Sequence, residues 1–101
     1  MVELSAATRL RVEALFEPGD VEAVADQLVA ECGEHLPMWH QKSPKGLERI
    51  RFAVLKLSDG DPVKLRQALD GAKSDWRDSL VAAGFGQDVE AHRDWFPAPR
   101  S

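Results

Sequence analysis

Residues 60–84 read GDPVKLRQALDGAKSDWRDSLVAAG, and this stretch decides the fold class. Asp61 can accept a hydrogen bond from a free amide of a first helical turn, Pro62 suits the first helical position, and Gly84 can adopt the left-handed conformation that ends a helix. Between these signals, apolar residues recur at the three- and four-residue spacing of a buried helix face: Leu65, Ala68, Leu69, Ala72, Trp76, Leu80 and Ala83. We therefore predict one long helix from Pro62 to Gly84, with Trp76 in the core.

This long pattern has one weak point, at Gly71 and the following Ser74-Asp75 pair. Glycine weakens a helix interior, and a serine or an aspartate can cap the start of a new helical segment. Asp75 and Asp78 would then both lie at the start of that segment, where negative charge is favourable. The sequence leaves open whether the helix is continuous or divided.

Two helices are predicted in the N-terminal part of the chain. The first runs from Ser5 to Phe16. Asp20 caps the second, Gly33 ends it, and its apolar residues form a single stripe: Val21, Val24, Ala25, Leu28 and Cys32. Cys32 is therefore expected to face the core. Residues 34–42 then form the one long connection.

A helix predicted over Pro44 to Leu57, after a Ser43 cap, is apolar on two sides. One side holds Leu47, Ile50, Val54 and Leu57, whereas Phe52 and Leu55 point well away from that stripe. A helix that is covered on two sides lies in the centre of its domain.

A short last helix is predicted over Gln87 to Trp95, with Val89, His92 and Phe96 facing inward. The fold class is then all-α, a compact orthogonal or bundle-like domain of five or six helices. A chain of 101 residues is the length of one such domain, spanning residues 1–101.

Composition narrows the class of protein. With 44% hydrophobic and 30% charged residues, and with no apolar run of the roughly 20 residues that a bilayer span needs, the chain reads as a soluble globular domain. The N-terminus lacks the pattern of a secretory signal, and a single cysteine forms no internal disulfide. We expect a cytoplasmic protein.

Charge is divided unevenly along the chain. Residues 1–40 carry eight acidic and two basic residues, whereas residues 41–66 carry seven basic and three acidic ones. The simpler interpretation is that the acidic and basic faces pack near each other or are exposed to solvent. The alternative interpretation is that the basic residues form a docking surface. On the Pro44 to Leu57 helix, Lys45, Arg49 and Lys56 fall on one face together with Phe52. Their charges are expected in solvent, with little role in folding.

Large aromatic residues at partly exposed positions often mark an interface. Trp39 in the long connection and Trp95 near the C-terminus fit that description, although both can also fold down over helix ends. The predicted partner-binding residues are Trp39, Lys45, Arg49, Phe52, Lys56 and Trp95. The favoured function is a regulatory or accessory protein that acts through protein–protein contacts.

Two other classes of function remain open. A short turn joins the basic helix to the next one, which matches a helix-turn-helix nucleic-acid binder in outline, although the net charge of −4 opposes phosphate affinity. A small enzyme or metal protein ranks third. The sequence holds no phosphate loop and no nucleophile motif, and we expect no cofactor.

The strongest metal candidate is the set Cys32, His35 and His40, whose spacing only loosely suggests zinc. A structural zinc site needs four ligands, and His92 lies some distance away in the sequence. We therefore expect Cys32 to be a buried thiol without metal and His92 to lie at the edge of the core.

The stretches GLERIRFAVLKL (residues 46–57) and DWRDSLVAAGF (residues 75–85) resemble those of small uncharacterised bacterial helical proteins. The resemblance covers roughly the C-terminal two-thirds of the chain. Its motifs are patterns of packing and capping, so it implies an all-helical fold and carries over neither a function nor a site.

Overall fold

The computed structural model describes residues 3–33, 36, 44–86 and 91–97. Within these residues the chain forms helices α1 (Ala6–Leu15), α2 (Val21–Glu31), α3 (Pro44–Ser58) and α4 (Pro62–Ala83) and the 3-10 turn η1 (Ala91–Asp94). The all-α prediction is confirmed, with four helices and a 3-10 turn among the described residues. Of the last helix predicted over Gln87 to Trp95, residues 91–94 form one turn of 3-10 helix, and residues 87–90 lie outside the described part of the chain.

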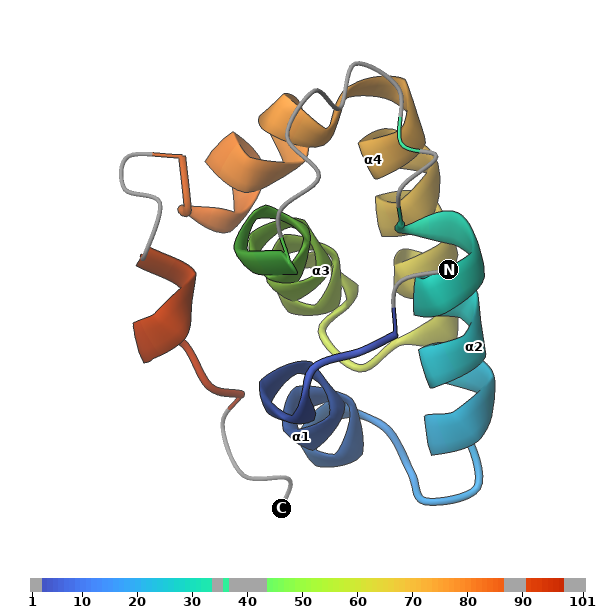
Figure 1. The fold of residues 1–101 in the computed structure, drawn as a ribbon. Helices are drawn as coiled ribbons and strands as arrows, with labels where there is room; N and C mark the ends of the chain where they lie inside the picture. Colours follow the sequence, from blue (N-terminus) through green and yellow to red (C-terminus); the bar gives the residue numbers. More distant parts are fainter. Residues whose placement is uncertain (1–2, 34–35, 37–43, 87–90, 98–101) are drawn as a thin grey trace.

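Helix α3 lies at the centre of the domain. Figure 1 looks nearly along its axis, with α4 above it and to the right, α2 at the right, α1 below and η1 at the left. The two apolar sides predicted for α3 are both buried, Leu47, Ile50 and Val54 on one side and Phe52 and Leu55 on the other. Helix α3 thus packs against α1, α4 and η1.

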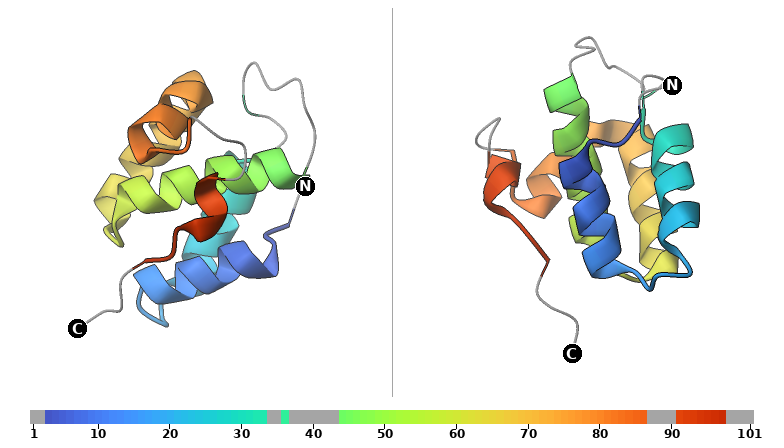
Figure 2. Two further views of the ribbon diagram at one scale, coloured as in Figure 1. Left: turned by 90° about the vertical axis from the view of Figure 1, so that its left-hand side faces the viewer. Right: turned by 60° about the horizontal axis from the view of Figure 1, so that its bottom comes forward.

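The neighbours of α3 run in different directions. In the left view of Figure 2, α3 crosses between α1 below and the C-terminal half of α4 above, and η1 lies beside it. Helix α2 packs on the N-terminal half of α4 instead (Figures 1 and 2). No described helix is long and apolar enough to cross a membrane.

Local capping chemistry sets the ends of α1 and α4. Ser5 Oγ accepts a hydrogen bond of 3.1 Å from the amide of Thr8 at the start of α1. Asp61 Oδ1 accepts one of 2.9 Å from the amide of Val63, and Gly84 ends α4 with a left-handed φ of 82°. The caps predicted at Asp61 and Gly84 are confirmed, and Ser5, predicted only as the start of the first helix, also acts as a cap.

The start of α2 differs from the prediction. Asp20 occupies the N-cap position, but its backbone is already helical and its side chain makes no capping hydrogen bond. The C-cap is Cys32, one residue before Gly33. The expected cap at Ser43 lies outside the described residues.

The weak point of α4 is a true break. Asp75 has φ −158° and ψ 98°, which is not helical, and its Oδ1 accepts a hydrogen bond of 3.0 Å from the amide of Arg77. Asp75 thus caps a second helical segment inside α4. Trp76 opens this segment and is only partly buried, so its predicted place in the core is wrong, and Ser79, Leu80 and Ala83 are buried after the break.

Candidate contact surface

Three of the predicted partner-binding residues contact Phe85, and a fourth, Phe52, packs against one of them, Trp95. Arg49 Nε donates a hydrogen bond of 3.1 Å to the Phe85 carbonyl, and Lys56 Nζ lies 5.0 Å from the centre of the Phe85 ring. The ring of Trp95 lies 6.1 Å from those of Phe85 and Phe52. Trp39 and the side chain of Lys45 lie outside the described residues.

Phe52 is fully buried, so its predicted place on the surface is wrong. Its ring packs 5.1 Å from the imidazole of His92 and 4.3 Å from the guanidinium carbon of Arg11. The physical reason is that the segment containing η1 crosses the second side of α3 and excludes water from it (Figure 2). Phe52 forms the floor beneath that segment.

Arg49 and Lys56 hold the end of α4 on α3, and the expectation that they have little role in folding is wrong. Both nitrogens of Arg49 that face α4 donate to the Phe85 carbonyl, and Lys56 Nζ donates a hydrogen bond of 2.8 Å to the Ala83 carbonyl. The last carbonyls of a helix lack partners within the helix and carry partial negative charge. Lys56 therefore caps α4 at its C-terminus, and Arg49 binds the carbonyl two residues beyond that end.

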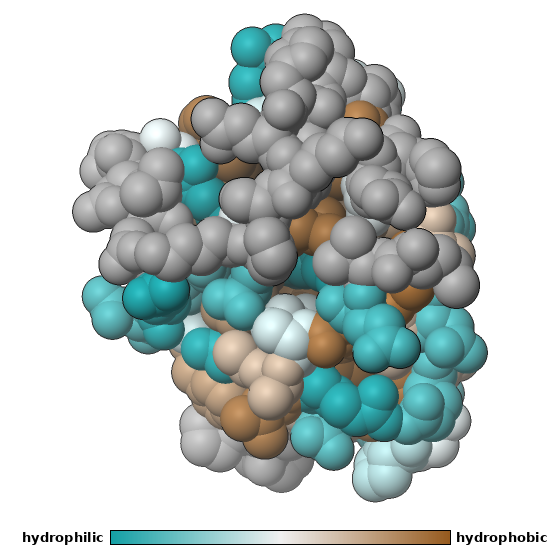
Figure 3. Space-filling view, in the orientation of Figure 1, coloured by the Kyte–Doolittle hydropathy of each residue, from teal (hydrophilic) through white to brown (hydrophobic). Residues whose placement is uncertain are grey.

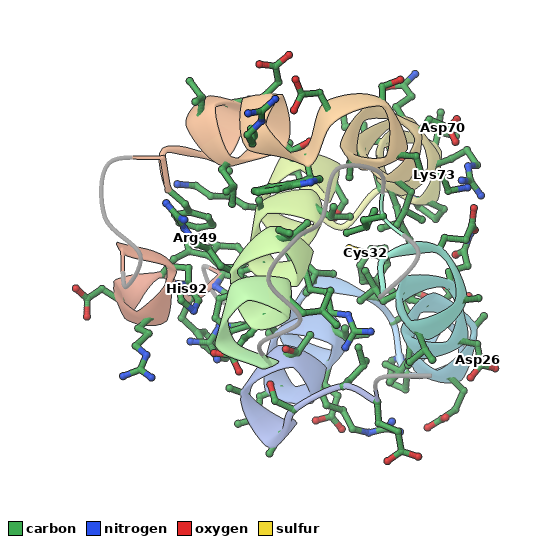
Figure 4. All side chains as sticks on the ribbon, turned by 45° about the horizontal axis from the view of Figure 1, so that its top comes forward. Asp26, Cys32, Arg49, Asp70, Lys73 and His92 are labelled. Carbon is green, nitrogen blue, oxygen red and sulfur yellow. The ribbon has the colours of Figure 1, made fainter. Side chains whose placement is uncertain are left out.

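His92 is a fully buried histidine next to these residues. Its Nε2 lies 3.4 Å from Glu48 Oε1, but neither ring nitrogen forms a hydrogen bond of good geometry among the described residues. Burial lowers the pKa of His92, and the neighbouring Glu48 opposes this shift only in part. Figure 4 shows Arg49 and His92 on the side of α3 that faces the C-terminal segment.

Glu48 also accepts a hydrogen bond of 2.7 Å on Oε2 from Ser5 Oγ. The resulting row of side-chain contacts runs from serine to carboxylate to imidazole. A nucleophilic serine needs the imidazole next to its own hydroxyl, so this order does not activate Ser5. Instead, these contacts connect the start of α1 to α3 and η1.

Cys32 is fully buried, as predicted, and burial raises the pKa of its thiol to about 12. Arg51, which the sequence analysis counted only as a basic residue, is also buried; its Nε donates a hydrogen bond of 2.8 Å to the Cys32 carbonyl. His35 and His40 lie outside the described residues. Within the described part of the chain, no three His, Cys, Asp or Glu side chains are grouped as metal ligands.

Acidic and basic groups from distant parts of the sequence pack together at one edge of the domain. Glu31 of α2 accepts hydrogen bonds of 2.7 and 2.5 Å from Arg66 and another from Lys73. These hydrogen bonds lower the pKa of Glu31 to about 2. Arg66 also pairs with Asp70, which lies with Lys73 on the outer side of α4 in Figure 4.

Arg11 is the residue that sequence reasoning missed. It is 9% exposed, and its Nε donates a hydrogen bond of 3.2 Å to the Trp95 carbonyl. Its guanidinium carbon lies 4.3 Å from the ring centre of Phe52 and 4.9 Å from that of Phe96. The one sequence signal is its place four residues before Leu15, on the apolar side of α1.

Phe96 is 52% exposed, so the prediction that it faces inward is wrong. The chain after Asp94 is no longer helical, and the helical spacing from His92 therefore does not apply to it. Leu10 of α1 is 55% exposed, and it shares a helix face with Ala14 at a spacing of four residues. Figure 3 shows hydrophobic side chains gathered where α1 meets the C-terminal segment.

We name the residues Leu10, Ala14, Trp95 and Phe96 the C-terminal surface. Directly beside it lies an open pocket of about 430 Å³, lined by Ala14, Leu15, Lys56, Asp59, Gly60, Trp95 and Pro97. Ala14 and Trp95 belong to both. The predicted residues Lys56 and Trp95 are thus brought together at the wall of this pocket.

Comparisons with models of protein families, with curated proteins and with solved structures found no match to this chain. What is shown is a small all-helical protein for which no family is identified.

Proposed function

We propose that this chain is a small cytoplasmic protein of bacterial type, with a regulatory or accessory role, that binds another protein through its C-terminal surface. The observation that carries the proposal is the position of Phe96, a large apolar ring that stays 52% exposed while a buried arginine holds it in place. Trp95 is the predicted contact residue that belongs to this surface. Trp39 and Lys45 remain predicted contacts.

A fixed, exposed aromatic ring favours binding for two reasons. Covering a phenylalanine side chain contributes roughly 1.5–3 kcal/mol when the burial is complete, so covering the exposed half of Phe96 contributes about half of that. In addition, Arg11 already restricts the ring, so less conformational entropy is lost when a partner arrives. Aromatic residues with these properties dominate the binding energy of many protein interfaces.

Neighbouring groups make the surface more than one isolated ring. Leu10 adds a second exposed apolar side chain on α1, and the hydrogen bond from Arg11 to the Trp95 carbonyl ties α1 to the C-terminal segment. The surface therefore combines side chains from both ends of the chain. A partner that covers it contacts both segments at once.

The test compares two substitutions of exposed apolar residues. The tagged chain, Phe96→Ser and Val81→Ser are each used to capture proteins from the source cell, with recovered proteins quantified by mass spectrometry. Val81 is the matched control because it is 71% exposed and lies on α4. Neither substitution removes a buried side chain, so both variants are expected to keep the fold.

The proposal predicts a protein that the parent and Val81→Ser both recover and that Phe96→Ser loses. Equal recovery by all three chains would overturn the proposed surface. Recovery of nucleic acid in place of a protein, with a steep loss on added salt, would favour the helix-turn-helix alternative instead.

A further inference from the structure

The pocket beside the C-terminal surface carries an unpaired negative charge at its wall. Asp59 is exposed, and its carboxylate forms no ion pair among the described residues. It stands at the end of α3 with a left-handed φ of 51°, a conformation in which few residue types other than glycine, asparagine and aspartate are common. The backbone there presents this carboxylate toward solvent next to an apolar wall.

The cation in the same wall is already engaged. Lys56 Nζ donates to the Ala83 carbonyl and lies over the Phe85 ring, so the end of α4 and an aromatic face hold its ammonium in place. The charge left for a ligand is therefore that of Asp59. The net charge of −4 on the whole chain adds to this preference for a cation.

Apolar side chains form part of the remaining wall, and the pocket is of suitable size. Leu15, Trp95 and Pro97 line the pocket, whose volume of about 430 Å³ lies within the range of sites that hold small ligands. An aromatic or leucine-sized side chain that enters from the C-terminal surface would contact these three residues. A cationic group next to that side chain would then reach the rim at Asp59.

We propose that this pocket receives one large apolar side chain of the protein partner, together with an adjacent lysine or arginine that pairs with Asp59. The inference rests on the proposed function, because it specifies the partner that the C-terminal surface binds. It adds a chemical preference that the exposed ring of Phe96 does not imply by itself.

The test uses three probes that share a phenyl ring and differ in charge: 2-phenylethylammonium, 2-phenylethanol and 3-phenylpropionate. Each is titrated into the isotope-labelled protein, and the amide signal of Gly60 and the indole signal of Trp95 are followed by NMR. The cation is expected to bind more tightly than the alcohol by about two- to five-fold, the size of one solvent-exposed ion pair. The anion is expected to bind most weakly.

Three variants locate the effect. Asp59→Asn removes the charge but tolerates the left-handed backbone, so it should abolish the difference between the cation and the alcohol. Ala14→Leu narrows the pocket from an exposed side of α1 and should weaken all three probes. Asp26→Asn is the control, since Asp26 is an exposed acid on the outer side of α2 (Figure 4) and should change nothing.

The anion binding more tightly than the cation, an unchanged preference in Asp59→Asn, or no shift with any probe would each overturn the inference. These results are separate from the test of the proposed function. A partner lost with Phe96→Ser but retained by both Asp59→Asn and Ala14→Leu would leave the C-terminal surface standing and refute the pocket. If the pocket binds the cation but Phe96→Ser captures the same proteins as the parent chain, only the proposed surface is refuted.

Discussion

Replacing Phe52 by alanine tests the interior that supports the C-terminal surface. The side chain is fully buried and packs edge-on against His92, with centroids 5.1 Å apart, and against Trp95, with centroids 6.1 Å apart. Truncating a buried phenylalanine costs about 3–5 kcal/mol, and the lost ring contacts and the lost contact with Arg11 favour the upper end of that range. A surface phenylalanine, by contrast, costs about 0.5 kcal/mol or less.

The assay is urea denaturation followed by far-ultraviolet circular dichroism. Phe52→Ala should lose most of the stability of a domain this small, with a melting temperature lower by roughly 20 °C or more. If that variant does not fold, Phe52→Leu keeps a measurable transition and should lose about 1–2 kcal/mol. Val81→Ala is the exposed control, expected within about 0.5 kcal/mol of the parent. A Phe52→Leu midpoint equal to that of the control would refute the burial of this side chain.

Two further predictions concern the backbone and the acid response. Gly60→Ala places a Cβ 2.6 Å from the Leu15 carbonyl at a φ of 76° and should destabilise the fold by at least about 1 kcal/mol. The Cβ of Gly71→Ala meets nothing within 4 Å, so this variant should stabilise α4 by about 0.5–1 kcal/mol. The urea midpoint should therefore fall for the first variant and rise for the second. The pKa of Glu31 is lowered from 4.5 to about 2, so its ion pairs stabilise the fold above pH 4.5 and that stability is lost as the pH falls toward 2. Glu31→Gln should therefore be less stable by about 1 kcal/mol at neutral pH, since solvent screens these partly exposed pairs, and should approach the parent near pH 2; a constant gap across that window would contradict the assignment.

The helix ends were predictable because capping is local. Ser5, Asp61 and Gly84 each act on backbone groups within a few residues, so the pattern that identifies them lies in one short stretch. The same holds for Asp75, whose side chain caps the residue two positions later. These signals predicted the all-α class and located the weak point of α4 without deciding whether the helix breaks there, whereas the missing capping bond of Asp20 shows that a suitable residue type does not ensure the bond.

The contact surface was harder to predict because long-range packing creates it. Phe52 is buried by a segment some forty positions later, and a pattern within α3 alone cannot distinguish a second packed side from an exposed one. Arg49 and Lys56 bind carbonyls that come within reach only when α4 docks on α3. Phe96 was predicted to face inward by extending a helical period from His92, but the helical residues end at Asp94.

The buried arginines show a second limit. Arg11 and Arg51 have the same charge as any surface cation, but hydrogen bonds to backbone carbonyls help to offset the cost of their burial. Those carbonyls belong to Trp95 and Cys32, which lie 84 and 19 positions away in the sequence. The sequence analysis therefore counted both arginines as charge and missed the one that fixes Phe96.

The most direct measurement of the central claim is amide hydrogen exchange of this chain, alone and bound to the protein that Phe96→Ser fails to capture. The proposed surface predicts that binding slows exchange in α1 and in residues 91–97, the two segments that meet at Arg11. The exposed side of α2 is expected to exchange at an unchanged rate. Slower exchange confined to α2 or to the N-terminal half of α4, with α1 and residues 91–97 unaffected, would contradict the account.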